Sequence, residues 1–442
     1  MQCQCPYPNC SENLPSHQAG CPKCGKPFKV CKSALCREVN RRFSRFCRSC
    51  GSPMPETDHD WTMFRGGIQR TGLSKMSLKL DFNALDSQTP LKELAAFQLN
   101  GPCHSLLFSE GRLIALSAEG EVFAADVLGD KATEVARFSL GGKVHAEPAI
   151  AGGLLFAAAD NQVMAYAIGG GVDGFMREEP YWKMSLTGQV HHSLLAIGDS
   201  LYCITDGGEG AELIAFDKIF TPSPKQIRLH SAKVFSPLAG KVTDQGHKIY
   251  FVSPEQGGTL YEIDHADGGE HVKTGRSLVM LNGYSLGTPI CVVGDMLFGI
   301  FGERKRLCRV KISLGQPLET RGDDVEHFAY AEMKKSILVS SSMIRDTDID
   351  KVGLLDPGES YRGMPVIIKD FAVAVSLNYG KVRLYDLKNL THSRNWQVGG
   401  SRSDVTALIS AGSLLAAGVS EGEARGKVVL ARFPKPNNTT GI

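Results

Sequence analysis

From residue 61 onward, the chain alternates short apolar runs, rich in β-branched and aromatic residues, with clusters of Gly, Asp and Asn. Almost no stretch shows the 3.6-residue period of an amphipathic helix, so the pattern predicts strands joined by tight turns. Three successive units, beginning at 103, 145 and 192, repeat the order of an apolar strand, a glycine turn and a second apolar strand. Each unit is expected to be a hairpin followed by a third strand.

The third strands recur at a regular distance. They end at Asp126, Asp217, Asp264, Asp356 and Asp386, with equivalents that lack the aspartate near Ala167, Lys311 and Arg432. The mean spacing of about 44 residues is the size of a four-stranded blade, and radial repetition of blades leaves few open sheet edges. The sequence therefore predicts an all-β fold, an eight-bladed β-propeller. Because Asp356 and Asp386 are only 30 residues apart, a seven-bladed propeller is the alternative.

The two ends of this region are predicted to meet. After the last third strand, at 428–433, too few residues remain to form an outermost strand. Residues 91–99 precede the first hairpin and have the composition of a strand. We expect them to complete the final blade and so close the ring.

The first fifty residues carry a different pattern, in which the spacing C-x4-C-x10-C-x2-C occurs twice with an offset of 26 residues. Tetrahedral Zn²⁺ takes four cysteine thiolates, so the repeat predicts two structural Zn²⁺ sites. A disulfide framework is the alternative, but it needs an oxidising compartment and the chain begins without a signal-like segment. Cys3 lies outside the repeat and could replace Cys5. The predicted ligands are Cys5, Cys10, Cys21 and Cys24 for the first site, and Cys31, Cys36, Cys47 and Cys50 for the second.

The composition divides the chain into three parts. Residues 53–60 combine two prolines with polar residues and no hydrophobic period, as in an extended linker. We expect a double zinc ribbon at 1–52, the linker at 53–60 and the propeller at 61–442.

Two resemblances support this division. The segment 61–72, Trp-Thr-Met-Phe-Arg-Gly-Gly-Ile-Gln-Arg-Thr-Gly, and the Gly-x-Leu/Val-x-Ala-x-Asp strands resemble pyrroloquinoline-quinone-like (PQQ-like) β-propellers. That family often has a Trp on the outer strand of each blade, and here Trp182 and Trp396 fit. Residues 5–53 resemble the double zinc ribbon of bacterial and archaeal proteins, although the first Cys-x4-Cys is longer than usual.

The PQQ-like resemblance is compatible with two kinds of protein, because the family contains quinone-dependent dehydrogenases and non-catalytic propellers, among them an outer-membrane barrel-assembly lipoprotein. The dehydrogenases are exported and use a vicinal disulfide, and this chain has no adjacent cysteine pair. It also has no Gly-x-Ser-x-Gly, Walker loop or His-Glu-x-x-His motif. Four further cysteines, at 103, 203, 291 and 308, are expected to be buried thiols. We therefore expect no enzymatic activity.

Positive charge is concentrated at the N-terminus. Residues 1–50 contain nine Lys or Arg and two Glu, a local charge of about +7 in a chain whose net charge is +2. Basic residues beside Phe43 and Phe46 could neutralise phosphates and stack on bases. The second ribbon is therefore a candidate nucleic-acid contact through Lys32, Arg37, Arg41, Arg42, Arg45 and Arg48.

Histidines recur at the starts of the predicted inner strands. Aligning the hairpins places His145, His191 and His327 at one position, together with Asp404, and His104 and His192 at the next. Inner strands converge near the central channel, so these imidazoles could bind an anion, a metal or an acidic side chain of a partner. Alternatively, each is an isolated strand-end histidine bonded to a neighbouring loop.

Without a catalytic motif, the protein is expected to act by binding other molecules at its surface. The preferred hypothesis is a non-catalytic interaction scaffold in which the propeller face binds protein partners and the ribbons form a small adaptor, within a multi-protein bacterial assembly. The alternatives are a nucleic-acid-binding protein and a quinone-dependent oxidoreductase. No apolar run reaches the roughly 18 residues of a membrane span, so a cytoplasmic protein without membrane contact is expected.

Overall fold

The structure is a computed structural model of the 442-residue chain. It describes residues 3–6, 10, 13–14, 28–31, 36, 38–41, 44, 47–52, 54, 63, 73–74, 78, 80–86, 90–169, 176–207, 210–221, 224–232, 237–243, 246–253, 259–265, 272–280, 291–293, 296–301, 306–311, 316–318, 366–368, 371–386, 392–422 and 424–434.

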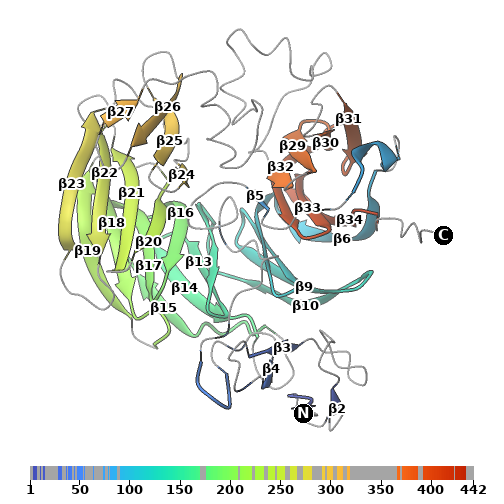
Figure 1. Ribbon diagram of the computed structural model, residues 1–442, viewed down its shortest axis with the longest axis horizontal. Coiled ribbons are helices and arrows are strands. Elements are labelled where there is room, and N and C mark those ends of the chain that lie inside the picture. The colour runs from blue at the N-terminus through green and yellow to red at the C-terminus, as the bar shows by residue number, and fades with distance from the viewer. Residues whose placement is uncertain are drawn as a thin grey trace.

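The described part of the propeller consists of sheets with four antiparallel strands that follow one another around a common axis (Figure 1), and two of these sheets gain a short parallel strand at the inner edge. We name these sheets blades A to G, and give the strands of each from the innermost to the outermost. Blade A contains β7 (Cys103–Ser109), β8 (Arg112–Ser117), β9 (Glu121–Leu128) and β10 (Lys131–Ser139). Blade B contains β12 (Ala149–Ala151), β13 (Leu154–Ala159), β14 (Gln162–Ala167) and β15 (Trp182–Ser185). Blade C contains β16 (Val190–Ile197), β17 (Ser200–Gly207), β18 (Gly210–Asp217) and β19 (Lys225–Ala232).

The second half of the ring repeats this order. Blade D contains β20 (Ala239–Thr243), β21 (Gly246–Ser253), β22 (Thr259–His265) and β23 (Val272–Met280). Blade E contains β24 (Cys291–Val293), β25 (Met296–Phe301), β26 (Arg306–Lys311) and β27 (Gln316–Leu318). Blade F contains β28 (Val366–Ile368), β29 (Ala372–Leu377), β30 (Lys381–Asp386) and β31 (Ser393–Gln397). Blade G contains β32 (Asp404–Ala411), β33 (Leu414–Ser420), β34 (Arg425–Arg432) and β6 (Lys92–Asn100).

The predicted all-β propeller is confirmed, and seven of the eight expected third strands are present as β9, β14, β18, β22, β26, β30 and β34. The eighth, which ends at Asp356, lies between β27 and β28 and outside the described residues. The choice between seven and eight blades therefore stays a prediction.

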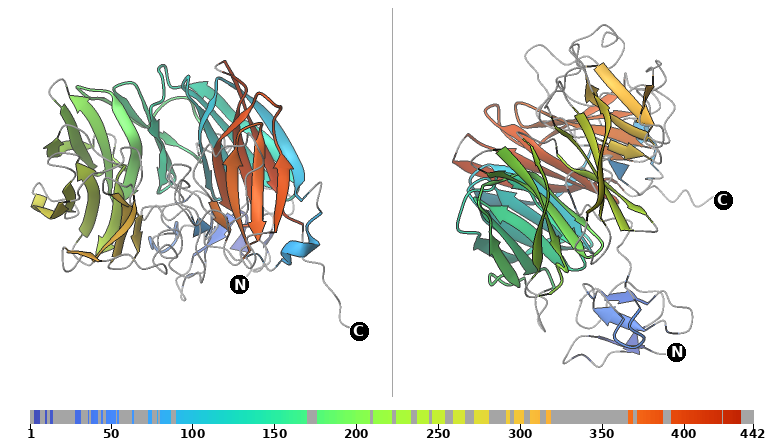
Figure 2. Two further views of the ribbon diagram at one scale, coloured as in Figure 1. Left: turned by 90° about the horizontal axis from the view of Figure 1, so that it is seen from above. Right: turned by 90° about the vertical axis from the view of Figure 1, so that its left-hand side faces the viewer.

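The predicted ring closure is also confirmed. Strand β6 pairs antiparallel with β34, so the outermost strand of the last blade comes from the start of the propeller (Figure 2). The register runs from Lys92 opposite Arg432 to Asn100 opposite Arg425. Both ends of the propeller are thus held in one sheet, which removes two open sheet edges.

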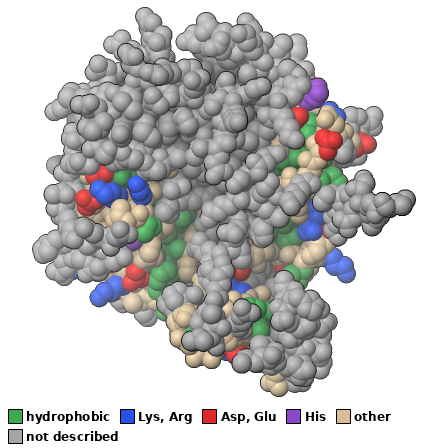
Figure 3. Space-filling view, in the orientation of Figure 1, with side chains coloured by type: hydrophobic (Ala, Val, Ile, Leu, Met, Phe, Trp, Pro, Cys, Tyr) green, Lys and Arg blue, Asp and Glu red, His purple; other side chains and the backbone are tan. Residues whose placement is uncertain are grey.

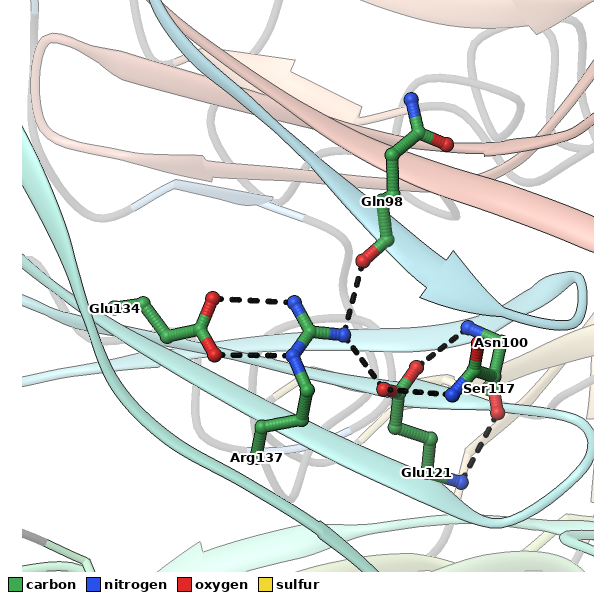
Figure 4. A network of polar contacts seen from close by, with 6 residues as sticks. All are labelled: Gln98, Asn100, Ser117, Glu121, Glu134 and Arg137. Carbon is green, nitrogen blue, oxygen red and sulfur yellow. Dashed lines mark hydrogen bonds and ion pairs between the residues drawn. The ribbon is translucent and has the colours of Figure 1, made fainter.

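Polar contacts reinforce this closure between blades G and A (Figure 4). Arg137 on β10 donates to the main-chain oxygen of Gln98 on β6 at 3.1 Å and to Glu121 Oε1 on β9 at 2.6 Å. The Glu121 carboxylate, which is almost fully buried, also accepts from the main-chain N–H of Asn100 at 2.6 Å. A second carboxylate, that of Glu134, accepts hydrogen bonds from Nε and Nη2 of Arg137.

The aspartate at the end of the third strand has a structural role. In blade A, Asp126 accepts from Arg112 Nε at 2.7 Å and Nη2 at 3.0 Å, and the buried Arg112 also donates to the main-chain oxygen of Ile168 in blade B. In blade C, Asp217 accepts from Ser200 Oγ at 3.0 Å. The aspartate therefore fixes the beginning of the second strand to the end of the third.

Both expected outer-strand tryptophans are confirmed, because Trp182 lies on β15 and Trp396 on β31, and each is buried. The Trp182 ring lies between Phe156 and Phe216, 5.9 Å from each, and its Nε1 donates to the main-chain oxygen of Ile219 at 2.7 Å. It thus packs blade B against blade C.

The N-terminal part contains short paired strands: β1 (Cys3–Gln4) with β2 (Asn13–Leu14), and β3 (Phe28–Val30) with β4 (Val39–Arg41). Strand β5 (Leu73–Ser74) pairs parallel with β28 of blade F, and η2 (Phe82–Ala84) is a short 3-10 helix. Of the segment 61–72, only Met63 is described; it forms a bridge to Ala149 in blade B. In the described part of the chain, no helix is long and apolar enough to cross a bilayer.

Candidate metal centre

The second ribbon brings its four predicted ligands together by two local structures. The β3–β4 hairpin places Cys31 beside Glu38, and the Cys31 N–H donates to the Glu38 oxygen at 2.9 Å. A turn follows at Cys47, where the Gly51 N–H donates to the Cys47 oxygen at 2.9 Å. Gly51 has a φ of 69°, a conformation that a side chain disfavours, as expected from the Cys-x-x-Cys-Gly pattern.

The Sγ atoms of Cys31, Cys36, Cys47 and Cys50 all lie within 4.8 Å of one another. The Cys31–Cys50 and Cys36–Cys47 sulfur distances are both 3.6 Å. These separations are too long for a disulfide, whose S–S bond is about 2.05 Å. They fit four sulfurs around one ion, since Zn–S bonds of about 2.3 Å in a tetrahedron hold the sulfurs a little under 4 Å apart. The cluster could therefore hold a metal ion.

Asn40 lies behind the four thiols and holds one of them, Cys47, in position. Its buried amide Nδ2 lies 3.4 Å from Cys47 Sγ and 2.9 Å from the Glu38 main-chain oxygen, to both of which it donates. Its Oδ1 accepts from the Arg48 N–H at 2.8 Å. Side chains that hold a ligand in this way are part of a metal site, because they fix the ligand's direction. No feature of the cysteine spacing pointed to Asn40.

The thiols differ in acidity. Burial raises the pKa of Cys47, but main-chain donors at Cys50 and Ser49 and the Asn40 amide outweigh burial and lower that pKa to about 6. The pKa of Cys50 is lowered by contacts with Ser52. The pKa of Cys36 is raised: a main-chain contact at Glu38 lowers it, but burial and the neighbouring sulfurs of Cys50 and Cys47 outweigh that contact. Four thiolates at this distance repel, so a cation would favour ionisation of all four.

The first ribbon is described only in part. Cys5 is buried and Cys10 is half-buried, whereas Cys21 and Cys24 lie outside the described residues. Cys3 lies on β1. The first metal site therefore stays a prediction.

The second ribbon contacts the propeller. Lys29 Nζ on β3 lies 3.0 Å from Oε1 of Glu110, which occupies the turn between β7 and β8 of blade A. Both side chains are largely buried, at 16% and 9% exposure. This contact, which the sequence did not indicate, fixes the four-cysteine cluster beside the propeller, and Figures 1 and 2 show the N-terminal part next to one side of the ring.

Of the predicted nucleic-acid residues, Arg48 is exposed but donates to Glu38 Oε1 at 2.5 and 3.0 Å. Arg41 lies on β4. The other four, Lys32, Arg37, Arg42 and Arg45, lie outside the described residues. The only member of the set whose side chain is described is thus paired with an acidic residue.

His104 and His191 lie at the starts of the inner strands β7 and β16, as expected, and His145 lies just before β11. The predicted alignment of these histidines needs one correction. The N–H groups of Ala118, Asp160 and Asp206 make the same main-chain bond in blades A, B and C, to the oxygens of Pro102, Lys143 and Gln189, each at 2.9 Å. His104, His145 and His191 each stand two residues after those acceptors, so His104 shares their position rather than the next one. His327 lies outside the described residues.

Asp404 is also shifted from its predicted alignment. Extra residues in the inner strands displace the register at His104 in blade A and at Thr406 in blade G. Thr406, and not Asp404, therefore matches the histidines. Such β-bulges could not be read from apolar periodicity here, because the inner strands β7 and β16 are buried along most of their length and show little alternation for an extra residue to interrupt.

The described histidines differ in how far their rings are buried. Burial of His104 lowers its pKa to about 4, and among the described residues its Nε2 has no hydrogen-bond partner. His145 and His191 remain partly exposed, with their ring centroids 6.2 Å apart. Only these two of the three predicted channel histidines are therefore shown to lie together.

The expected buried thiols are confirmed for Cys103 and Cys203. Burial raises the pKa of both, and the charge of Glu147 adds to the effect at Cys103. Cys291 and Cys308 lie on β24 and β26. A raised pKa disfavours the reactive thiolate form, so Cys103 and Cys203 are in surroundings typical of unreactive buried thiols.

A buried polar cluster between blades C and D was missed. Tyr202 Oη lies 2.7 Å from His265 Nδ1 and 3.2 Å from His247 Nδ1, and His265 Nε2 lies 3.6 Å from Asp217 Oδ1. All four side chains are buried. The histidines are 18 residues apart in sequence, and nothing in the apolar pattern marks them as neighbours of Tyr202.

Comparison with known proteins supports the propeller assignment. Residues 78–219 match the family model described as outer membrane protein assembly factor BamB. No curated protein matches the sequence. BamB from Moraxella catarrhalis is similar in structure, with a TM-score of 0.51 and 14% identity over 78% of this chain and 100% of that chain.

Two further solved structures are similar. The computationally designed Ika8 protein has a TM-score of 0.51 and 14% identity over 77% of this chain and 99% of that one. A europium-containing methanol dehydrogenase has a TM-score of 0.50 and 10% identity over 85% and 98% of the two chains. At these identities the likeness shows the fold, and the chain contains a BamB-like PQQ repeat region in an all-β propeller.

Proposed function

We propose that this protein is a non-catalytic interaction scaffold, in which a zinc-folded double ribbon at 1–52 is docked beside a propeller at 61–442 and both present a surface to protein partners. The supporting observation is the largely buried Lys29–Glu110 ion pair, which joins the four-cysteine ribbon to blade A. A ribbon held in this way can contribute with the propeller to one binding surface. Proteins of this fold serve unrelated functions, so the proposal depends on the docked ribbon and not on the fold.

Zinc is the proposed ion at the second site, and by the sequence repeat at the first, giving two ions per chain. Soft thiolates in a tetrahedral group favour zinc among the common metals. Four cysteine ligands leave no position for an activated water, so the ion stabilises the ribbon instead of performing chemistry. Free thiolates also favour a reducing compartment, and we propose that the protein works in the cytoplasm.

The alternative of nucleic-acid binding has less support. Arg48 is paired with Glu38. On the face shown in Figure 3, the basic side chains of the described residues lie in small separate groups, some of them beside acidic side chains. A phosphate-binding surface instead gathers positive charge. Binding to nucleic acid would weaken steeply with salt, which separates it from a protein contact.

The proposal is tested by affinity capture with the tagged full chain from a lysate of the source organism, with and without nuclease treatment. We expect a defined set of proteins to be enriched, and to be reduced several-fold when Cys31 and Cys47 are both replaced by Ser. Enrichment that disappears with nuclease treatment would favour the nucleic-acid alternative. Equal enrichment by the Cys31→Ser/Cys47→Ser variant would remove the ribbon from the binding surface.

A further inference from the structure

The turn between β29 and β30 of blade F exposes an aromatic residue on an unfavourable main chain. Tyr379 has a φ of 59° and is 42% exposed, and the next residue, Gly380, has a φ of 61°. Two left-handed residues in a hairpin turn are usually Asn-Gly or Asp-Gly, because a bulky side chain disfavours this conformation. Residues held in such conformations cluster at functional sites. Tyr379 therefore stands where stability alone would favour a smaller residue.

Blade B shows that the fold does not require an aromatic residue at this turn. The equivalent turn, between β13 and β14, carries Asp160 at a φ of 49°, and the strands on either side of it pair antiparallel as in blade F. Aspartate is one of the residues that usually occupy this conformation. The ring of Tyr379 is therefore an addition to the turn.

The loop between β31 and β32, which leads from blade F to blade G, holds this turn in one position. The Gly380 N–H donates to the Ser403 oxygen at 2.6 Å. Gln397 Nε2 donates to the main-chain oxygens of Tyr379 at 2.7 Å and Gly399 at 2.5 Å. A Cβ atom at Gly380 would lie 2.5 Å from main-chain atoms of Gly399, so the turn and the loop are in close contact. A side chain on such a rigid support loses little conformational entropy when it binds a partner.

The same loop carries an exposed cation, Arg402. Within the described part of the chain, its guanidinium has no ion-pair partner. By contrast, Lys143 lies 3.6 Å from Glu119 and Lys427 lies 3.2 Å from Glu421. Tyr and Arg are among the residues most enriched at the centres of protein interfaces. We call the β29–β30 turn and the loop, with these two side chains, the Tyr379–Arg402 surface.

This surface lies at the end of the propeller opposite to the ribbon contact. In each antiparallel blade, the turns after the first and third strands lie at one end, and the turn after the second strand lies at the other end with the link to the next blade. Glu110, which contacts Lys29, is in a turn after a first strand. Tyr379 is in a turn after a second strand, and Arg402 is in a link. The Lys29–Glu110 contact therefore leaves this surface uncovered.

We propose that the Tyr379–Arg402 surface binds a short acidic segment of a protein partner, with an apolar residue on the Tyr379 ring and a carboxylate on the Arg402 guanidinium. An exposed guanidinium offers a carboxylate two parallel hydrogen bonds. A nucleic acid suits the surface less well, because a strand that extends from it would meet Glu119, Asp160 and Asp206, whose side chains at the same end are 50%, 56% and 59% exposed. The proposal rests on the scaffold function and adds a second partner surface to it.

The experiment is a selection of random 12-residue peptides, displayed on phage, against the immobilised full chain. We expect the enriched peptides to share acidic residues beside an apolar one. The most enriched peptide is then synthesised with a fluorescent label and titrated with the protein, and its anisotropy is measured. Arg402→Glu and Tyr379→Asn should each weaken its binding about tenfold or more, as expected of residues at the centre of an interface.

Tyr379→Asn separates binding from folding, because asparagine suits a left-handed turn. Its thermal unfolding temperature should equal or exceed that of the unaltered protein, although peptide binding is weakened. Tyr181→Asn is the matched control, since Tyr181 is 44% exposed and precedes β15 at the end of the ring that contacts the ribbon. It should bind the peptide like the unaltered protein.

The proposal is overturned if no acidic peptide is enriched, or if Tyr379→Asn and Arg402→Glu bind the peptide as tightly as Tyr181→Asn does. It is also overturned if a labelled single strand of DNA binds the unaltered protein and this binding is lost in Arg402→Glu. Its failure is distinct from failure of the scaffold function. A full chain that captures proteins from a lysate but selects no acidic peptide would keep the scaffold function and remove this surface from it.

Discussion

Lys29 Nζ of the second ribbon lies 3.0 Å from Glu110 Oε1 in the first hairpin of the propeller. The two residues are 81 positions apart, and Glu110 sits at a φ of 51° in a tight turn with Gly111. The turn thus directs a carboxylate toward the ribbon. This contact joins the four-cysteine segment to the propeller, and the position of that segment should depend on it.

Replacing Lys29 by Met is expected to release the ribbon from blade A. The loss should be on the order of 1–3 kcal/mol of docking free energy, because a mostly buried carboxylate loses an opposite charge. Faster hydrogen exchange at β3 and at the β7–β8 turn would show it. Lys92→Met is the matched control, since the Lys92–Asp130 pair is exposed and should contribute less than about 1 kcal/mol. Unchanged exchange in Lys29→Met would contradict the docking role.

Replacing Arg137 by Met should destabilise the ring closure. The guanidinium contacts Glu121, Glu134 and the main chain of β6, and its loss leaves the buried Glu121 without its cation (Figure 4). We expect a loss of about 2–4 kcal/mol in the free energy of unfolding, measured by chemical denaturation. Glu134→Ala, which removes an exposed partner of the same group, should cost less than about 1 kcal/mol. Equal effects of the two variants would argue against a closing role for Glu121.

Removing the Tyr202 hydroxyl should loosen the contact between blades C and D. Tyr202→Phe deletes hydrogen bonds to both His247 and His265 in a buried cluster, at an expected cost of about 1–3 kcal/mol in unfolding free energy. Tyr181→Phe is the control, because the Tyr181 ring is exposed and its hydroxyl makes one bond, to the Phe220 oxygen at 3.3 Å. Thermal unfolding of both variants checks this, and a Tyr202→Phe protein as stable as the control would be the contrary result.

Acid should destabilise the protein through His104. Burial lowers its pKa to about 4, whereas in the unfolded chain its pKa is near 6.5. The unfolded state therefore binds the proton first, and stability is lost as the pH falls from about 6.5 to about 4. The loss is at most about 3.4 kcal/mol, since each pKa unit corresponds to about 1.36 kcal/mol. His104→Gln should flatten the stability profile measured by denaturation between these pH values; an unchanged slope would show that other groups cause it.

The periodic features of the chain predicted the fold well. Short apolar runs ending in aspartate marked the third strands, because the aspartate at Asp126 and Asp217 anchors a neighbouring strand in each blade. The shortage of residues after β34 marked β6 as the closing strand, because a blade needs four strands. The cysteine spacing likewise marked the second site, because four thiols must meet at one point.

The contacts between distant segments could not be predicted. Lys29 and Glu110 each look like an ordinary surface charge in sequence, and Asn40 is one asparagine among polar residues. Tyr202 and His247 come from different blades, so their contact depends on the angle between sheets. The alignment of His104 was wrong by one residue because bulges displace the inner strands.

The central proposal is that zinc folds the ribbon and that the folded ribbon docks on the propeller. Hydrogen exchange of the full chain before and after zinc removal with a chelator tests it most directly, with the metal content measured in parallel. We predict two Zn²⁺ per chain before treatment. After it, exchange should increase at β3, β4 and the β7–β8 turn, and stay unchanged in β13 and β14 of blade B. Unaltered protection of β3 and β4 in the zinc-free protein would contradict both the structural role of the metal and the adaptor proposed from it.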